Sequence, residues 1–216
     1  MSASLVGSEM CIRDRCKLSL DNVDYIRRSG QSQELMRCYE LDFFAGNGRL
    51  AFTTPHIDSL PQAYGLYDIR KEKFHVIGKY KAKTVTSSNG DIWTGYDGMI
   101  CRYDEKGDSL LLYTEEDMPD ISSLLVSGNK IWVGTYEGLY VIEKGEKARC
   151  LVDGPEFYRL FESSSGEVWA GCRTGGLYRI MPDEKVVWYS DSNAEPFHIE
   201  SNQIRSFAED RFGNIW

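Results

Sequence analysis

The sequence predicts an all-β protein assembled from a unit of four short strands that repeats along the chain. One observation is the spacing of four of its five tryptophans: Trp93, Trp132, Trp169 and Trp216 stand at intervals of 39, 37 and 47 residues. A second is that each of them stands in the same local pattern of apolar residues and glycines. The third is composition, because 12% aromatic residues and twenty glycines favour short strands joined by tight turns.

The repeated pattern begins with a polar or glycine turn, continues with an apolar residue, Trp, any residue and Gly, and resumes after a few residues with a second Gly. The copies read SSNGDIWTGYDGMICRYD, VSGNKIWVGTYEGLYVIE and SSSGEVWAGCRTGGLYRI, and EDRFGNIW opens another. An earlier copy places Ala51 where the others have Trp, 42 residues before Trp93. The residues expected to be structural in the repeat are Trp93, Gly95, Gly98, Trp132, Gly134, Gly138, Trp169, Gly171, Gly176 and Trp216.

Each copy predicts four strands. One contains the Trp and one follows the second Gly; a third is a segment such as KVVWYSD, and a fourth precedes the next turn, as in ISSLLVSG, FYRLFESS and IRSFAED. Four strands in a period of about 40–45 residues are typical of a β-propeller blade. We therefore expect residues 16–216 to form an incomplete β-propeller of about four blades, with repeats centred near Ala51, Trp93, Trp132 and Trp169 and a truncated one at Trp216. The alternative is a β-sandwich with accidental Trp spacing.

Local chemistry assigns roles within the blade. Ile131 and Trp132 are adjacent and both apolar, which predicts a strand buried on both faces between two neighbouring sheets. The Gly after each Trp allows close approach of another segment, and the second Gly closes a hairpin. The longest interval carries a polar stretch, SDSNAEPFHIESN, which is expected to project as a loop.

Both ends of the chain are expected to be truncations. Residues 1–15, MSASLVGSEMCIRDR, resemble translated adaptor sequence that precedes unrelated reading frames, or form a disordered tail. They lack the apolar core of a secretory signal. No stretch of about 18 apolar residues predicts a membrane span within the sequence. The net charge of −8 without a basic run argues against nucleic-acid binding.

The six cysteines do not have the spacing of a metal site, and no histidine stands at a zinc-like offset. We expect them to be small buried or half-buried thiols; a disulfide pairing cannot be read from their spacing. They are Cys11, Cys16, Cys38, Cys101, Cys150 and Cys172. No cofactor or metal is expected.

The segments SNQIRSFAEDRFGNIW, IWVGTYEGLYVI and VWAGCRTGGLYRI resemble the two-component regulator propeller repeats of bacterial hybrid two-component histidine kinases. The positions that match the first half of that motif are Asn202, Ile204, Ser206, Glu209, Asp210, Gly213, Ile215 and Trp216, and those that match its second half are Trp132, Gly134, Thr135, Gly138 and Leu139. The Gly-Thr pair is kept only once, and the Ala51 copy lacks Trp. The resemblance covers roughly residues 45–216.

The resemblance implies a piece of a periplasmic, ligand-sensing ectodomain that responds to glycans, anchored by an inner-membrane span elsewhere in its parent protein. It further implies missing blades and downstream domains as partners, a homodimer of the full-length protein, and no enzymatic activity in this fragment. Two alternatives remain open: a secreted propeller enzyme of the streptogramin-lyase type, and a non-catalytic interaction scaffold.

Ligand contacts are expected at the hairpin tips that follow the Trp strands, because binding residues gather on loops. Aromatic and polar side chains suit the stacking of sugar rings and the binding of hydroxyls. The expected ligand is an oligosaccharide, and the candidate residues are Tyr96, Asp97, Tyr136, Glu137 and Arg173. The alternative interpretation makes them ordinary turn residues. The acidic run at 115–117 with Asp120, and His198, are weaker candidates for acid–base chemistry, and we expect a solvated turn and an exposed loop residue instead. No catalytic residue is assigned.

Overall fold

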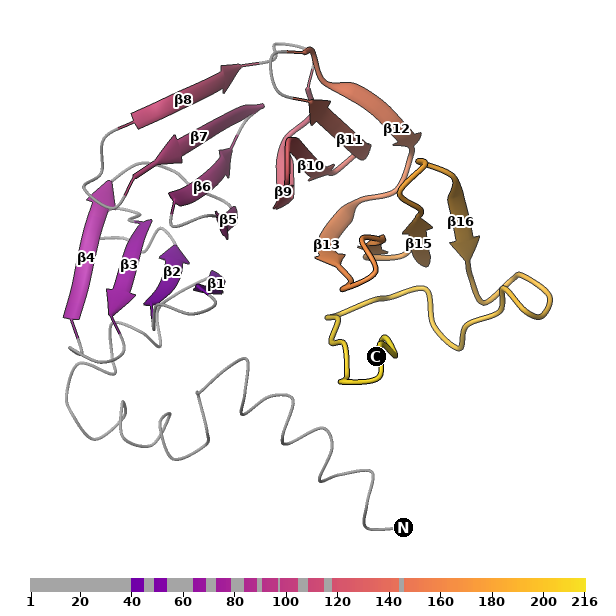
Figure 1. The fold of residues 1–216 in the computed structure, drawn as a ribbon. Coiled ribbons are helices and arrows are strands. Elements are labelled where there is room, and N and C mark those ends of the chain that lie inside the picture. The colour runs from indigo at the N-terminus through magenta and orange to yellow at the C-terminus, as the bar shows by residue number, and fades with distance from the viewer. Residues whose placement is uncertain are drawn as a thin grey trace, which may run out of the picture. The chain divides into compact units, whose positions relative to one another are not determined.

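The computed structural model describes residues 40–44, 49–53, 64–68, 73–78, 84–88, 91–96, 98–104, 109–114, 118–143 and 146–216. Within these residues the chain is all β, with sixteen strands and no helix (Figure 1). The expected class is therefore confirmed at the level of an all-β fold of antiparallel sheets. Residues 1–15 and the acidic run at 115–117 lie outside the described residues.

The strands form four sheets, each a meander of four strands that are consecutive in sequence and antiparallel. The sheets contain, in order, β1 (Glu40–Phe44), β2 (Arg49–Thr53), β3 (Tyr64–Asp68) and β4 (Lys73–Gly78); β5 (Thr84–Ser88), β6 (Asp91–Tyr96), β7 (Met99–Tyr103) and β8 (Ser109–Thr114); β9 (Ile121–Ser127), β10 (Lys130–Thr135), β11 (Gly138–Glu143) and β12 (Arg149–Asp153); β13 (Phe157–Glu162), β14 (Val168–Cys172), β15 (Leu177–Ile180) and β16 (Val186–Tyr189).

The register of these sheets follows the sequence repeat. Trp93, Trp132 and Trp169 lie in the second strands β6, β10 and β14. Ala51 is the central residue of β2, paired with Asp42 on β1 and Leu66 on β3. The position that lacks Trp thus belongs to the same strand of its own sheet, and the four-strand period predicted from the tryptophans is confirmed.

The chain divides into two compact units, residues 1–82 with 208–216, and residues 83–207. The first contains the sheet β1–β4 and the second contains the other three sheets. Within the second unit the first strands β5, β9 and β13 lie beside one another, while the fourth strands β8, β12 and β16 lie on the far side (Figure 1).

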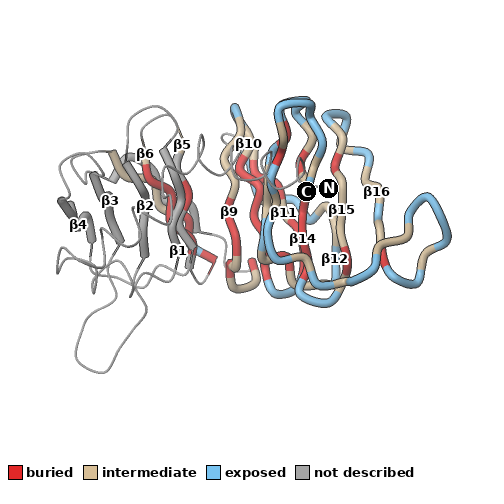
Figure 2. The backbone as a smooth tube through the Cα atoms, turned by 90° about the horizontal axis from the view of Figure 1, so that it is seen from below, coloured by how far each residue is buried: buried red, intermediate tan, exposed pale blue. Residues whose placement is uncertain are grey.

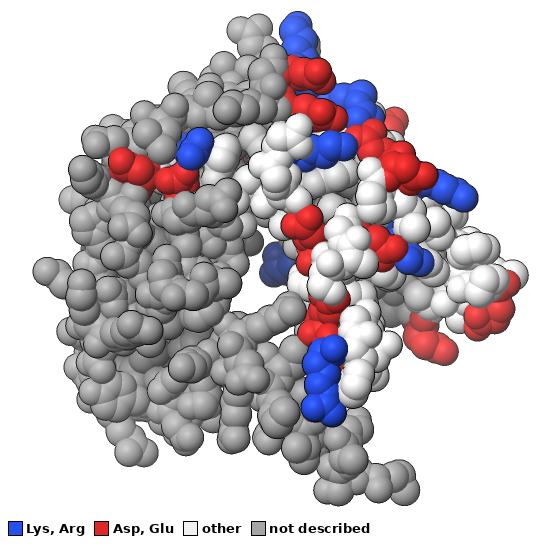
Figure 3. Space-filling view, viewed as in Figure 1, with Lys and Arg blue, Asp and Glu red and all other residues white. Residues whose placement is uncertain are grey.

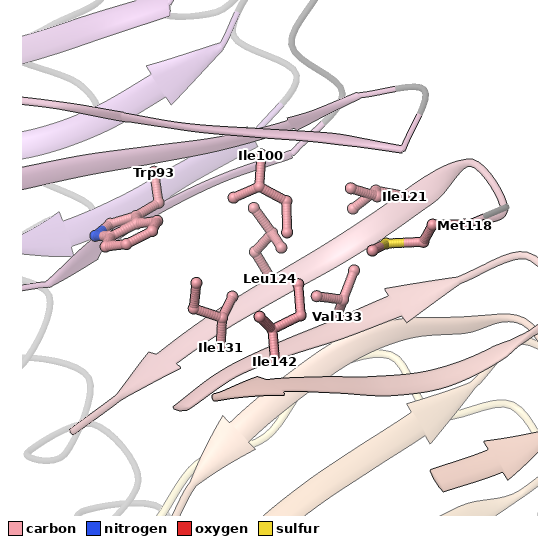
Figure 4. Close-up of a cluster of buried hydrophobic side chains, with 8 residues drawn as sticks. All are labelled: Trp93, Ile100, Met118, Ile121, Leu124, Ile131, Val133 and Ile142. Atoms are coloured by element: carbon pink, nitrogen blue, oxygen red, sulfur yellow. The ribbon is translucent and has the colours of Figure 1, made fainter. Parts of the chain in front are cut away.

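The sheets of the second unit pack face to face through apolar side chains from their central strands. Trp93 and Ile100 of one sheet meet residues of β9–β11 in the first cluster (Figure 4). In the second cluster, Trp132 and its neighbours meet residues of β13–β15. The first cluster contains Trp93, Ile100, Met118, Ile121, Leu124, Ile131, Val133 and Ile142, and the second contains Trp132, Leu139, Val141, Phe157, Val168, Ala170, Cys172 and Ile180.

Adjacent residues of β10 therefore serve opposite faces, with Ile131 in one cluster and Trp132 in the other. Figure 2 shows these buried stretches running along β9 and β10, with exposed residues toward the hairpin ends. The prediction that the Trp strand is covered on both faces is confirmed for β10. At about 25 cal/mol per Å² of apolar surface, each buried Ile or Trp contributes a few kcal/mol to keeping neighbouring sheets together.

The Gly after Trp132 and the Gly after Trp169 each lie against a later segment of the chain. A Cβ on Gly134 would lie 2.1 Å from the carbonyl oxygen of Phe157, the first residue of β13, and 2.1 Å from Ser123 Oγ. A Cβ on Gly171 would lie 2.8 Å from the side chain of Ile204. Phe157 and Ile204 thus occupy equivalent places, and only glycine leaves room for them.

A cation covers the rings of Trp93, Trp132 and Trp169. Arg102, paired in register with Trp93, lies 5.5 Å from its ring centroid, and Arg179, paired with Trp169, lies 5.3 Å away. Each Arg also forms an ion pair with the acid two residues before the Trp: Arg102 with Asp91, and Arg179 with Glu167 at 2.5 Å. Such stacking contributes roughly 0.5–1 kcal/mol at exposed sites.

In the sheet β9–β12 the cation comes from the Trp strand itself, two residues before Trp132, rather than from the paired strand. Lys130 lies 5.8 Å from the Trp132 ring centroid. It bonds Glu184, in the turn between β15 and β16, at 2.6 Å, and Arg149 of β12 donates to the other oxygen of that carboxylate at 2.7 Å. The hydrogen bond from Lys130 is the main cause that lowers the pKa of Glu184 below its ordinary value. This ion cluster joins two neighbouring sheets.

The segment after β16 differs from the prediction. IRSFAED was expected to be a strand, but residues 190–216 form only two isolated bridges, Ser190 with His198 and Glu209 with Ile215. The predicted polar loop at 190–202 is confirmed, with Phe197 44% exposed. Trp216, expected to pack like the other tryptophans, is 75% exposed, because no described segment covers its ring.

The turn at 210–214 nevertheless repeats the β13–β14 turn bond for bond. Asp210 N–H donates to the Asn214 carbonyl, and Gly213 N–H donates to the Asp210 carbonyl. Ser163, Gly166 and Glu167 make the same two bonds. Gly166 and Gly213 both have left-handed φ, 81° and 84°. The hydrogen bond from the Asn214 side chain is the main cause that lowers the pKa of Asp210 to about 2. Residues 204–216 thus have the local geometry of a repeat start.

Gly134→Ala should destabilise the protein by about 3 kcal/mol, because the new methyl group would collide with the backbone of β13 and with Ser123 rather than with a mobile side chain. Urea unfolding followed by tryptophan fluorescence measures this. Asn129→Ala, in an exposed turn of the same sheet, is the control and should change stability by at most about 0.5 kcal/mol. Equal losses in the two variants would contradict the close-approach role of Gly134.

Glu184→Gln should lower stability by about 1 kcal/mol at pH 7 and have a smaller effect at pH 3.5. The folded pKa of Glu184 is lowered, so its stabilising contribution is present above about pH 4.5 and is lost as the pH falls through the folded pKa. Urea unfolding midpoints at the two pH values test this, with Glu146→Gln in an exposed turn as the control. A difference from the parent protein that does not change with pH would contradict the assignment.

Candidate functional site

The strongest candidate site lies where the first strands begin, next to the tips between second and third strands. At two of the tips a backbone hydrogen bond reaches the residue that precedes the first strand of the same sheet: Tyr136 N–H donates to Asp120 O, and Arg173 N–H donates to Glu156 O, both at 3.2 Å. We call this region the rim; it comprises residues 120–122, 136–137, 156–159, 173 and 203–205. All of it belongs to the second unit.

A β-bulge occurs at the same rim position in two neighbouring sheets. Along β9, Ile121 and Ser123 pair with successive residues of β10, so that Ser122 is the extra residue. Along β13, Phe157 and Arg159 pair with successive residues of β14, so that Tyr158 is the extra residue. Bulges redirect a side chain away from the regular pleat and are common beside functional sites.

The two bulges are used differently. Ser122 Oγ and Ser123 Oγ both donate to Phe157 O at 2.7 Å, which closes this part of the rim onto the next sheet. The Tyr158 hydroxyl is buried and has no hydrogen-bond partner within the described residues. Because a buried hydroxyl without a partner costs free energy, this atom is where a bound group or a water would be most favourable.

Cations gather around Tyr158. The Arg173 guanidinium lies 5.8 Å from the centroid of its ring, and the Arg159 guanidinium lies 5.1 Å away. Arg173 Nε bonds Glu156 Oε2 at 2.9 Å while the Arg173 side chain stays 59% exposed. Arg159 donates to the carbonyl oxygens of Tyr158 and Arg205. The rim of this sheet therefore combines an aromatic ring, an ion pair and a second guanidinium.

The tip of the preceding sheet is rigidly supported. Thr135 is fully buried; its hydroxyl donates to Gly138 O at 2.9 Å and accepts from Glu137 N–H at 3.2 Å. The Glu137 carbonyl in turn accepts from Gly154 N–H. This explains the Thr of the repeat motif: its side chain fixes the two-residue tip that presents Tyr136 and Glu137 to solvent.

Cys172 occupies the place of Thr135 in the next sheet, where the tip is four residues long. It is fully buried, and burial raises the pKa of its thiol to about 12. The thiol is therefore protonated at neutral pH and is a packing residue. The described cysteines Cys101, Cys150 and Cys172 are free thiols. The expectation of buried or half-buried thiols is confirmed for Cys172 and Cys101 and is wrong for Cys150, which is exposed on β12.

The five residues predicted as ligand contacts fare unequally. Tyr136, Glu137 and Arg173 lie exposed at tips of adjacent sheets, as predicted, and Arg173 is joined to Glu156 and Tyr158. Tyr96 is the last residue of β6 and Asp97 follows it; the side chain of Tyr96 and the whole of Asp97 lie outside the described residues. A role in binding stays a prediction for all five.

Glu156, Tyr158 and Arg159 were not predicted from the sequence. The sequence carried only a weak signal for them. The run EFYR stands at the start of the strand that precedes the Gly turn, and its Tyr158 aligns with Ser122 and Arg205 in the other copies. Register alone does not reveal the bulge that turns Tyr158 toward Arg173. His198 is half-buried, and its Nδ1 lies 3.2 Å from Asn193 O within the loop, apart from the rim residues.

Charges of both signs are interspersed over the described surface in Figure 3, without a large basic patch on this face. In the described part of the chain, no group of three or more His, Cys, Asp or Glu side chains is arranged to hold a metal ion. None of the described residues belongs to a helix long and apolar enough to span a membrane.

No protein-family model matches the chain, and no curated protein sequence matches it. Solved structures do. The extracellular domain of the putative hybrid two component system BT4673 from B. thetaiotaomicron matches with a TM-score of 0.62 and 16% identity over 83% of this chain. A second structure of that domain, described as part of a putative one component system, matches with a TM-score of 0.60. The chain spans 25% of that domain's length.

Two further matches have other origins. PorZ, a bacterial surface component of the type-IX secretion system of Porphyromonas gingivalis, matches with a TM-score of 0.59 and 15% identity over 80% of this chain and 29% of its own. The computationally designed protein Ika8 matches with a TM-score of 0.55 and 12% identity over 82% of this chain and 57% of its own. At these identities the likeness shows a shared fold.

Proposed function

We propose that this chain is part of a β-propeller in the ligand-sensing extracytoplasmic region of a two-component sensor, and that its ligand is a saccharide. Each four-stranded sheet is then one blade. The ligand contacts the rim, and the signalling domains belong to other parts of the parent protein. The location would be the periplasm of a bacterium, outside the inner membrane.

The propeller part of the proposal is supported by the way consecutive sheets are joined. The first strands of three sheets lie beside one another, and each sheet covers the tryptophan of the one before it. A meander of this kind cannot bury both faces alone, so repetition is needed for stability. The likeness to the BT4673 extracellular domain supports the sensor part.

The observation that carries the binding part is the meeting, at one rim, of exposed tips from adjacent sheets with an unpartnered buried hydroxyl. Tyr136 offers a ring face for stacking, and the Arg173–Glu156 pair offers both donors and acceptors for hydroxyl groups. Sugars present these two features together: an apolar ring face and a border of hydroxyls.

A sensor of this kind acts by population shift. A ligand that contacts residues from two adjacent sheets binds more tightly to the arrangement in which both tips reach it, and it raises the population of that arrangement by its difference in affinity. Coupling of about 1–3 kcal/mol between the rim and the rest of the parent protein is typical of such systems. No chemical step at the rim is required.

The interaction scaffold is the second candidate, because PorZ shares the fold to a similar degree and is described as a surface component of a secretion system. A scaffold would use the same tips to contact a protein surface. The saccharide proposal is preferred because the rim carries polar, charged and aromatic side chains rather than a broad apolar patch.

Tyr136→Ala should weaken saccharide binding about fivefold to tenfold, since stacking on an exposed aromatic ring contributes roughly 1 kcal/mol. Isothermal titration calorimetry with a panel of plant and host oligosaccharides measures this. Phe212→Ala, which removes another exposed aromatic ring, is the control and should leave affinity unchanged. If no member of the panel binds and a protein partner is captured by the same tips, the scaffold candidate replaces the sensor.

A sequencing read through the genomic locus tests the sensor assignment independently of ligand. We expect the frame to continue into further repeats, then a hydrophobic span of about 20 residues and a histidine kinase. A frame that closes after a few repeats without a span or kinase would contradict it and favour a secreted protein.

A further inference from the structure

We propose that the cluster of Tyr158, Arg159 and Arg173 binds an oxyanion substituent, so that the sensed saccharide is acidic, with a carboxylate or a sulfate group. This inference rests on the proposed function and narrows it to a ligand class. It concerns three side chains around one buried hydroxyl, of which the sequence analysis named only Arg173.

The geometry brings several donors to one aromatic ring. Both guanidinium groups lie within 6 Å of the centroid of the Tyr158 ring, at 5.1 Å for Arg159 and 5.8 Å for Arg173. The Tyr158 hydroxyl is a further donor that has no partner among the described residues. Guanidinium groups and hydroxyls together are a donor set that planar or tetrahedral oxyanions satisfy well, because the Arg fork matches two oxygens at once.

Arg173 is the residue best placed to make the new contact. Its Nε is directed to Glu156 at 2.9 Å, and its side chain is 59% exposed. Its other two nitrogens form no hydrogen bond with the described residues. Arg173 can therefore keep its ion pair and still present the terminal fork to a ligand. Arg159 is fixed by donating to two backbone carbonyls.

Around Tyr158 the arginines outnumber the carboxylates although the chain as a whole carries −8, and the other two rim carboxylates, Asp120 and Glu137, belong to the preceding sheet. Arg159, Arg173 and Arg205 stand against the single carboxylate of Glu156 in this part of the rim, and Arg205 occupies the place equivalent to Tyr158 in the next segment. Glu156 opposes an incoming anion and holds Arg173 Nε. It is therefore a residue whose neutralisation should improve oxyanion binding rather than impair it.

The test compares three saccharides of similar size by calorimetry at low salt: a trigalacturonate, a neutral galactotriose and a sulfated disaccharide. The acidic ligands should bind at least tenfold more tightly than the neutral one, with a difference that falls as salt is added. Comparing the affinities for the trigalacturonate and the sulfated disaccharide shows whether the site prefers a carboxylate or a sulfate group.

Variants then locate the contact. Arg173→Gln and Arg159→Gln should each weaken acidic-ligand binding about tenfold, and Tyr158→Phe should weaken it a few fold while keeping the ring. Arg173→Lys, which retains the charge and loses the fork, should lie between. Lys147→Gln, which removes an exposed cation outside the rim, is the control and should have little effect.

Glu156→Gln should strengthen acidic-ligand binding about threefold and weaken neutral binding, because it removes the opposing charge and one acceptor. A gain cannot arise from misfolding, so this variant tests the inference even if others unfold. Equal affinity for acidic and neutral ligands, or acidic binding unaffected by the two Arg variants, overturns the inference. If neutral saccharides still bind through Tyr136, the proposed function stands without it; if no saccharide binds, both fall.

Discussion

The structure of the second unit depends on one repeated contact: a glycine that follows a Trp lies directly against a residue further along the chain, which in one case is the first residue of the next sheet. Phe157 over Gly134 and Ile204 over Gly171 are two instances. A side chain at either glycine would push the two sheets apart, and with them the apolar clusters in which Trp132 and its neighbours are buried. The glycines therefore set the distance at which the tryptophans can be covered.

The same contact places the candidate site. Because the first strand of each sheet begins directly beside the Trp strand of the preceding one, its second residue lies at the rim whatever its identity. The bulges at Ser122 and Tyr158 occur there, one beside a closed serine contact and one beside two guanidinium groups. Packing requirements thus fix the location of the rim, whereas the residues that fill it determine what it can bind.

The fold was accessible from sequence because its signal repeats. Trp and Gly positions recur at each sheet, and even Ala51, which lacks the ring, was placed in the correct strand. The segment IRSFAED was predicted as a strand and is not one. Among the described residues its only ladder contact is a single antiparallel bridge between Glu209 and Ile215. Site residues were harder: Arg173 was named from its tip position, but Tyr158 depends on a bulge, and a bulge is a register shift that leaves no mark in the apolar pattern.

Bulged residues stand outside the ladder, and this has an evolutionary consequence. Ser122, Tyr158 and Arg205 occupy equivalent places, yet they are a small hydroxyl, an aromatic ring and a cation. None is paired in register with a second strand and none belongs to the two apolar clusters, so an exchange at these places leaves the side chains of those clusters unchanged. Recognition can therefore diversify one repeat at a time while the scaffold remains under separate selection, and new specificities can arise through single substitutions.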